Sequence, residues 1–236
     1  MRLGQKFREE SKPPVASWLL LAMLLLTACS NPPAKDVNLG IVTAESATPL
    51  IAAAGKGDIA RVKALVESKA PVNARGPDAT PLTQAAANGN DEVVWYLLRS
   101  GAEPDLAPPD GVTALMVASR EGNGRIVEML LRAGAEINSV NATGDTALAW
   151  AARNGNLSTV KLLLSRGGNV NVARSGESLL MQVVGQNDLL MSQVLIDAGA
   201  DVHYRSPDDG ETALDVARRV GNEDLVMLLV QSGAGS

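Results

Sequence analysis

The 236-residue chain has little of several residue types from which active sites are commonly built. It contains one histidine and one cysteine, and only 3% of its residues are aromatic. His203 alone cannot form a multi-histidine metal site, and Cys29 alone permits neither an internal disulfide bond nor a cysteine-based zinc site. We therefore expect no metal site, no cofactor and no enzymatic function.

The charge of the chain is mildly acidic, with 21 Lys and Arg residues against 26 Asp and Glu residues and a formal net charge of −5. No basic block interrupts the body of the chain, which argues against a groove for nucleic acid. The length allows one or two domains with a sizeable buried core.

The N-terminal segment differs in composition from the rest of the chain. Its basic residues precede an apolar run from Val15 to Leu26. This run is shorter than the roughly 20 apolar residues that a membrane-spanning helix needs. A basic head, a short apolar run and small residues before a cut are typical of a secretory signal peptide, which we predict over residues 1–28.

The tetrapeptide Leu-Thr-Ala-Cys ends at Cys29 and resembles the lipobox of bacterial lipoproteins. In those proteins the cysteine is acylated and becomes the first residue of the mature chain, so the resemblance implies that Cys29 is the lipidation site. Several acyl chains would anchor the protein stably, because each buried methylene contributes about 0.8 kcal/mol. The alternative is an ordinary signal peptide beside an unrelated cysteine.

Residues 29–47 are mostly polar, contain a Pro-Pro pair and show no sustained period, which predicts a flexible tether. Ser30 resembles the residue of lipoproteins that are sorted to the outer membrane, whereas an Asp there would favour the inner membrane. We therefore expect a lipid-anchored protein of the bacterial envelope that faces the periplasm. The outer membrane is the favoured location of the anchor, and the inner membrane is the alternative.

From Thr48 onward the chain repeats itself with a period of 32 to 34 residues. Each copy begins with a similar stretch of eleven residues, continues into an apolar run such as VVWYLL, and in most cases ends in Gly-Ala. The six starts are TPLIAAAGKGD at Thr48, TPLTQAAANGN at Thr80, TALMVASREGN at Thr113, TALAWAARNGN at Thr146, SLLMQVVGQND at Ser178 and TALDVARRVGN at Thr212. The pattern resembles the ankyrin repeat over residues 48–236. It implies an all-α solenoid of about six helix-turn-helix repeats with projecting hairpin loops.

Local residue chemistry agrees with this reading. The Thr or Ser at each start can cap a helix, and Pro49 and Pro81 suit the first helical position, where no N–H is missed. Glycine marks most turns and helix ends, with Asn187 replacing it at one turn and Lys69 at one helix end. We expect both replacements to adopt the left-handed backbone conformation, which costs a non-glycine residue roughly 1 kcal/mol.

The fifth repeat departs furthest from the others. A Val-Val pair replaces the small pair, Gly185 replaces a polar residue, and Ser192 falls at a normally apolar position. We therefore predict that this repeat is the least stable part of the solenoid, because each repeat depends on its own contacts and those of its neighbours.

Partners of ankyrin domains usually lie against the concave face formed by the first helices and the hairpin tips, so the resemblance implies a protein-binding site there. Carried over by position, this site contains Lys56, Arg75, Arg120, Glu121, Arg153, Asn154, Arg174, Gln186, Arg205 and Arg219. Arg120, Arg153 and Arg219 are equivalent residues, and arginine is favoured in interfaces. We expect Arg153, the central one, to contribute most to binding and to lie outside the core. Solvated surface charges are the alternative interpretation.

The sequence thus predicts a non-catalytic, monomeric protein-binding module that supports a periplasmic protein. The alternative function is that of an immunity protein which blocks a toxin delivered to the periplasm. Trp95 is expected on the convex side, as a further contact point or as an ordinary exposed residue. Met227 takes an outward position at the C-terminal end, where it marks either a docking surface or, in the favoured interpretation, an imperfect cap of the solenoid.

Overall fold

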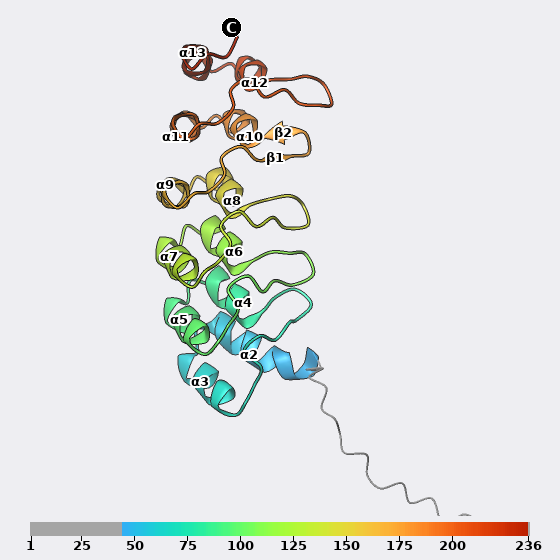
Figure 1. Cartoon of the computed structure of the whole chain (residues 1–236), viewed down its shortest axis with the longest axis vertical. Coiled ribbons are helices and arrows are strands. Elements are labelled where there is room, and N and C mark those ends of the chain that lie inside the picture. The colour runs from blue at the N-terminus through green and yellow to red at the C-terminus, as the bar shows by residue number, and fades with distance from the viewer. Residues whose placement is uncertain (1–43, 236) are drawn as a thin grey trace, which may run out of the picture. The chain divides into compact units, whose positions relative to one another are not determined.

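The computed structural model describes residues 44–235, and it builds them from pairs of helices that stack in chain order (Figure 1). Each pair consists of a first helix, a tight turn and a second helix, and an extended loop then leads to the next pair. The predicted signal peptide, the predicted lipidation site Cys29 and the predicted tether up to residue 43 lie outside the described residues.

The first helices form one column and the second helices form another (Figure 1). The first helices are α2 (Ala44–Lys56), α4 (Pro81–Ala87), α6 (Ala114–Arg120), α8 (Ala147–Arg153), α10 (Leu179–Gly185) and α12 (Ala213–Val220). The second helices are α3 (Ile59–Glu67), α5 (Asp91–Arg99), α7 (Gly124–Arg132), α9 (Leu157–Ser165), α11 (Leu189–Asp197) and α13 (Glu223–Gln231). The predicted all-α solenoid of six repeats is therefore confirmed.

The loop that leads into the fifth repeat contains the two strands assigned within the described residues. Each such loop is counted below with the repeat that it enters. Strands β1 (Ala173–Arg174) and β2 (Glu177–Ser178) pair antiparallel, with Ala173 opposite Ser178 and Arg174 opposite Glu177. The turn between them contains Ser175 with a positive φ of 51°. The other extended loops project on the same side as this hairpin (Figure 1).

The predicted helix caps are confirmed in the second to sixth repeats. In each, the hydroxyl of the first residue accepts a hydrogen bond from the backbone N–H three residues later, and these residues are Thr80, Thr113, Thr146, Ser178 and Thr212. This bond satisfies one of the N–H groups that a helix start leaves without an intrahelical partner. Pro81 lies at the first helical position, as predicted.

For the first repeat, the predicted helix start at Thr48 and Pro49 is wrong. Helix α2 begins at Ala44, so Thr48 does not mark its start and Pro49 lies inside the helix. In the later repeats an incoming loop turns the chain just before the cap. Helix α2 instead continues past Thr48 toward the N-terminus, at the cost of the one backbone hydrogen bond that proline cannot donate.

Small side chains allow neighbouring first helices to pack closely. The pairs Ala85-Ala86 and Ala151-Ala152 are almost fully buried, and leucines from the second helices fill the space behind them. The fifth repeat differs, because the buried pair there is Val183-Val184. Helices α8 and α10 are packed least closely among neighbouring first helices. The larger Val183-Val184 pair thus lies on a helix of the loosest junction between first helices.

Candidate protein-binding surface

The first helices and the loops that project beside them form a hollowed face in the middle of the stack. A hollow of about 460 Å³ is lined by residues of the third, fourth and fifth repeats. A second hollow, of about 250 Å³, shares Asp110, Val112, Arg120 and Trp150 with the first. The two hollows therefore form one continuous depression, called the central groove below.

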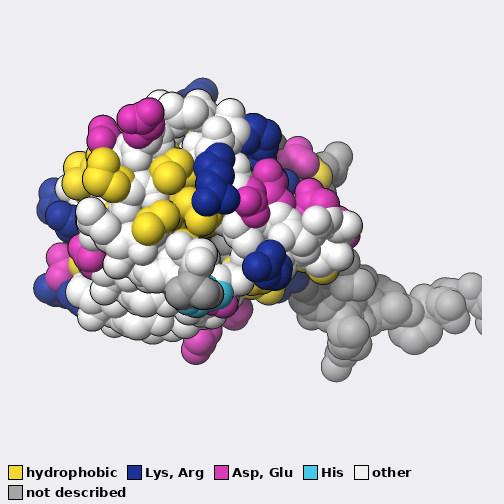
Figure 2. All heavy atoms as spheres, turned by 90° about the horizontal axis from the view of Figure 1, so that it is seen from above, with side chains coloured by type: hydrophobic (Ala, Val, Ile, Leu, Met, Phe, Trp, Pro, Cys, Tyr) yellow, Lys and Arg dark blue, Asp and Glu magenta, His cyan; other side chains and the backbone are white. Residues whose placement is uncertain are grey.

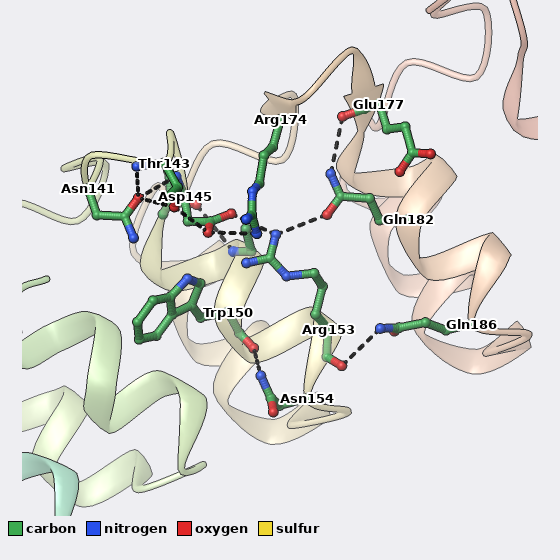
Figure 3. Close-up of polar contacts among 12 residues, drawn as sticks. Asn141, Thr143, Asp145, Trp150, Arg153, Asn154, Arg174, Glu177, Gln182 and Gln186 are labelled. Atoms are coloured by element: carbon green, nitrogen blue, oxygen red, sulfur yellow. Dashed lines mark hydrogen bonds and ion pairs between the residues drawn. The ribbon is translucent and has the colours of Figure 1, made fainter. Parts of the chain in front are cut away.

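The electrostatic centre of the groove is Asp145, whose side chain is only 3% exposed. One carboxylate oxygen lies 2.7 Å from Nη1 of Arg153, and the other lies 3.0 Å from Nη1 of Arg174. Figure 3 shows the two guanidinium groups reaching Asp145 from the end of α8 and from β1. One carboxylate thus links the fourth repeat to the fifth.

A local loop structure holds Asp145 in place. The side-chain oxygen of Asn141 accepts hydrogen bonds from the backbone N–H groups of Thr143 and Asp145, at 3.0 and 2.9 Å. The Thr143 hydroxyl donates to Asp145 at 2.9 Å. Since these bonds arise within five consecutive residues, the loop orients the carboxylate before any partner arrives.

The environment of Asp145 favours its charged form. Burial by itself raises the pKa of Asp145, because it disfavours the charged carboxylate. The guanidinium of Arg153, 2.7 Å from one oxygen, together with polar contacts from Trp150 and Thr143, outweighs burial and leaves the pKa below the usual value. Asp145 is therefore ionised at neutral pH and serves as the fixed counter-ion of two arginines.

Arg153 lines the groove, but it is less exposed than the other arginines there. Its side chain is 17% exposed, and its guanidinium contacts Asp145 and also donates to the side-chain oxygen of Gln182 at 3.0 Å. A buried acid on the incoming loop draws the guanidinium inward, so much of its charge is used within the protein. Arg153 joins the fourth repeat to the fifth.

Arg120 lies at the equivalent position of the third repeat and is the more accessible residue. Its side chain is 43% exposed, its guanidinium lies over the Trp150 ring at 5.2 Å from the ring centre, and its Nε donates to Glu121 at 2.8 Å. Stacking over an indole is a favourable cation–π contact that also orients the guanidinium. Arg120 and Trp150 thus form a flat, partly exposed platform in the groove.

The structure brings some of the predicted binding residues together and separates others. Arg120, Arg153, Asn154 and Arg174 line the central groove. Glu121 pairs with Arg120, and Gln186 donates to the backbone oxygen of Arg153 at 3.2 Å. The remaining predicted residues are exposed but belong to other parts of the stack, and they are Lys56, Arg75, Arg205 and Arg219.

The sequence prediction missed Asp145, Trp150 and Asn141, which are central to the groove. A signal for the ion pair does exist in the sequence. Asp145 precedes Arg153 by eight residues, and the same spacing separates Glu211 from Arg219, which are bonded through two N–H groups at 3.1 Å. An acid just before the capping threonine, combined with an arginine at the end of the first helix, therefore indicates an internal ion pair.

The opposite face carries exposed apolar residues, as predicted. Trp95 and Met227 on the second helices are 49% and 54% exposed. Arg99 lies over the Trp95 ring at 5.0 Å from its centre, which covers part of the indole.

Two features are absent from residues 44–235. No group of three or more His, Cys, Asp or Glu side chains is arranged there to hold a metal ion. None of the helices in this part of the chain combines the length and the apolar character needed to cross a bilayer.

Family comparison agrees with this architecture. A three-copy ankyrin-repeat model matches residues 19–108 and 100–174, and a single ankyrin-repeat model matches residues 209–235. The chain belongs to the ankyrin-repeat family. Proteins of this family are generally non-catalytic interaction modules, and no catalytic family is indicated for this chain.

Two curated proteins resemble part of the chain. Over 83 residues the chain is 40% identical to ankyrin repeat and SAM domain-containing protein 6 of Rattus norvegicus, an alignment that covers 34% of the chain. The corresponding mouse protein is 39% identical over 83 residues. The chain spans only 9% of the length of these curated relatives, so they support the repeat alone.

Two solved structures match most of the chain. The ankyrin repeat domain of Bcl-3, a member of the IkappaB family, aligns with a TM-score of 0.72 and 32% identity over 80% of this chain and 87% of that one. A chain from the complex of the Bd0816 predatory endopeptidase of Bdellovibrio bacteriovorus with immunity protein Bd3460 aligns with a TM-score of 0.70 and 34% identity. That alignment covers 78% of this chain and 97% of the other.

Proposed function

We propose that this ankyrin-repeat module is attached to the bacterial envelope and binds a periplasmic protein through the central groove. The observation that carries this proposal is the platform of Arg120 over Trp150 beside the Asp145 ion-pair network. Aromatic and arginine side chains that are already oriented bind a partner with little loss of conformational freedom. The groove also lies in the middle of the stack, where neighbouring repeats on both sides hold it.

The groove offers donors to an acidic group of the partner. Arg120 and Arg174 have half-exposed guanidinium groups, and each uses only part of its donor set in the ion pairs described above. A planar guanidinium matches a carboxylate with two parallel hydrogen bonds. We infer that a partner Asp, Glu or C-terminal carboxylate lies between these two arginines.

Attachment to the envelope rests on the sequence around Cys29, which resembles a lipobox. We propose acylation of Cys29 and an anchor in the outer membrane. Replacing this residue, Cys29→Ser, should release the protein from membranes, and fractionation after a salt wash measures this. A variant that still fractionates with the outer membrane would contradict the anchor.

A pull-down from solubilised envelopes with the lipidated protein tests the binding site. We expect Arg120→Ala to weaken recovery of the partner by about tenfold, from typical interface hot-spot magnitudes. The matched control is Lys161→Ala on α9, an exposed cation on the opposite face, which should leave recovery unchanged. If the control weakens binding and Arg120→Ala does not, the partner uses the second-helix face and the site is misplaced.

An immunity function is the second candidate, and one observation favours it. The chain matches a solved structure that contains an immunity protein and an endopeptidase, at 34% identity over most of its length. Under this hypothesis the partner is an envelope-degrading enzyme whose gene neighbours that of this chain. Adding the purified protein to that enzyme at an equimolar ratio should abolish its activity, and Arg120→Ala should restore it. Binding without inhibition would leave the support role and exclude the immunity role.

A further inference from the structure

The second-helix face at the C-terminal end carries a patch of exposed apolar side chains, which lies away from the central groove. Leu189 and Leu190 on α11 and Met227 and Val230 on α13 are between 39% and 59% exposed. A groove of about 490 Å³ runs between the two helices and is lined by Leu189, Leu190, Gln193, Asp224, Met227, Leu228 and Gln231. Figure 2 looks onto this end of the stack and shows hydrophobic side chains gathered on the side of the second helices, with both acidic and basic side chains around them.

The position of the patch at the end of the stack accounts for the exposure of Val230, whose equivalents Leu164 and Ile196 are apolar and half-buried, but it does not account for Leu190 and Met227. Leu190 and Met227 point outward from the second helices, at positions that other repeats expose as well. The equivalent residues of the third and fourth repeats are polar or charged: Arg125 and Ser158 for Leu190, and Glu128 and Lys161 for Met227. These two apolar substitutions therefore distinguish the last two repeats from the middle of the stack.

The rim of the patch is acidic. Asp197, Glu223 and Asp224 are exposed on the same two helices, and neither α11 nor α13 contains a lysine or an arginine. The nearest cation among the equivalent outward positions is Lys161 on α9, which lies on the far side of α11 from α13 (Figure 1). An apolar groove with an acidic rim thus faces solvent.

We propose that the groove between α11 and α13 docks an amphipathic helix of a partner protein, with leucine-type residues on one face and lysine or arginine along its flanks. A third helix can pack its side-chain ridge into the groove between two neighbouring helices, and helix-in-groove binding uses such apolar anchors. Basic flanks would meet the acidic rim, and this complementarity speeds encounter and selects the partner. The proposal does not depend on the function assigned to the central groove.

Charge also argues against two other occupants. A second copy of the chain placed symmetrically on the patch would bring Asp197, Glu223 and Asp224 of both copies together, and like charges repel. An anionic membrane surface would meet the same repulsion, since headgroup attraction requires lysine or arginine near the surface.

The probe for this site is a synthetic amphipathic helix of about 18 residues, with leucine on one face and lysine on its flanks. We expect the full-length protein to bind it and the double variant Leu190→Gln/Met227→Gln to bind it about tenfold more weakly, as measured by fluorescence anisotropy of the labelled peptide. These substitutions leave the net charge unchanged. The matched control is Val140→Gln, which replaces an exposed apolar residue outside α11 and α13 and should leave the affinity unchanged. The same peptide with glutamate in place of lysine should bind about tenfold more weakly to the wild type.

Three results would overturn the proposal. Equal affinity of the lysine peptide for the double variant and for the wild type would show that the acidic protein attracts the peptide without using the groove. Self-association of the wild type that the double variant loses, seen by analytical ultracentrifugation, would identify a second copy as the occupant. Binding of the wild type to vesicles containing anionic lipid, lost in the double variant, would identify a membrane instead.

Discussion

Replacing Arg153 with methionine tests whether the ion-pair network of the groove stabilises the fold. The substitution keeps an apolar stem of similar length but leaves Asp145, which is 3% exposed, without its closest counter-ion. Removing one partner of a buried pair typically costs about 3–5 kcal/mol, because the remaining charge stays buried. Arg174 remains 3.0 Å from the other carboxylate oxygen and offsets part of this loss. We therefore expect the free energy of unfolding to fall by about 2 kcal/mol.

The equivalent ion pair of the sixth repeat provides the matched control. Arg219 pairs with Glu211, but the Arg219 side chain is 62% exposed and solvent screens the pair. An exposed ion pair contributes about 0–1 kcal/mol, so Arg219→Met should have at most a small effect. Urea unfolding followed by far-UV circular dichroism and by tryptophan fluorescence measures both variants. Two probes are needed, because repeat proteins can unfold in parts.

A rescue experiment separates the cost of the unpaired charge from the loss of packing. Adding Asp145→Asn to the Arg153→Met variant removes the buried charge, and we expect it to recover about 1 kcal/mol of the free energy of unfolding. Equal losses for Arg153→Met and Arg219→Met would refute the reasoning. Failure of the second substitution to recover stability would also refute it.

The remaining predictions concern the junction between the fourth and fifth repeats, the titration of the network and the accessibility of the platform. Asp188→Asn should raise the free energy of unfolding by about 1 kcal/mol in urea titrations. The side-chain amide of an asparagine can donate to backbone oxygens of the preceding repeat, as Asn90 and Asn156 do, and a carboxylate cannot. Amide hydrogen exchange measured by mass spectrometry should be fastest among the helical segments at residues 185–192 and in α13, and uniform protection would contradict a weak fifth repeat. The lowered pKa of Asp145 means that the stability it contributes is complete above its unfolded pKa of about 3.9 and is lost as the pH falls through the folded value. The difference in the free energy of unfolding between wild type and Asp145→Asn should thus stay constant from about pH 7 to 5 and narrow below about pH 4 in parallel titrations. Val112→Glu places an acid eight residues before Arg120, as in the fourth and sixth repeats, and should draw the guanidinium off the indole. Partner binding should then weaken by about tenfold in the same pull-down. Because Val112 is half-buried against the core, some loss of the melting temperature is expected as well.

Features that depend on local signals could be predicted from the sequence. The repeat period gave the stacked helix pairs, and threonine or serine at the repeat starts gave the caps of the second to sixth repeats. Lys69 and Asn187 have positive φ values of 68° and 63°, as expected of residues that replace glycine at a helix end and a turn. Each of these features is determined within a few residues of the chain, so a single sequence contains enough information to find them.

Features that depend on how repeats meet could not be predicted in the same way. Whether Arg153 faces solvent depends on the carboxylate of Asp145, which the incoming loop turns toward the end of α8. The Trp150 indole contributes to the groove only because Arg120 from the preceding repeat lies over it. The extension of α2 past Thr48 to Ala44 could not be predicted either, because Thr48-Pro49 is the same start signal as Thr80-Pro81, which does cap its helix.

The junction between the fourth and fifth repeats shows how polar contacts replace close packing. In two other repeats the asparagine before the second helix donates to backbone oxygens of the preceding repeat, as Asn90 and Asn156 do. Asp188 holds this position in the fifth repeat, where the side-chain amide of Gln186 donates to the Arg153 oxygen instead. The ion pair of Arg174 with the Asp145 carboxylate crosses the same junction. Stability at this junction thus depends on groove residues that a partner would also contact, so binding there and local stability are linked.

The central groove arises because equivalent arginines have different neighbours. In the fourth repeat a short buried acid, Asp145, draws Arg153 inward. In the sixth repeat the acid is a longer glutamate, and the pair with Arg219 stays at the surface. In the third repeat the corresponding position is Val112, so Arg120 has no such partner and lies over an indole of the next repeat. Recurrence of arginine alone therefore does not locate a binding site in a repeat protein. The residue eight positions before each arginine decides whether its charge serves the fold or remains accessible to a partner.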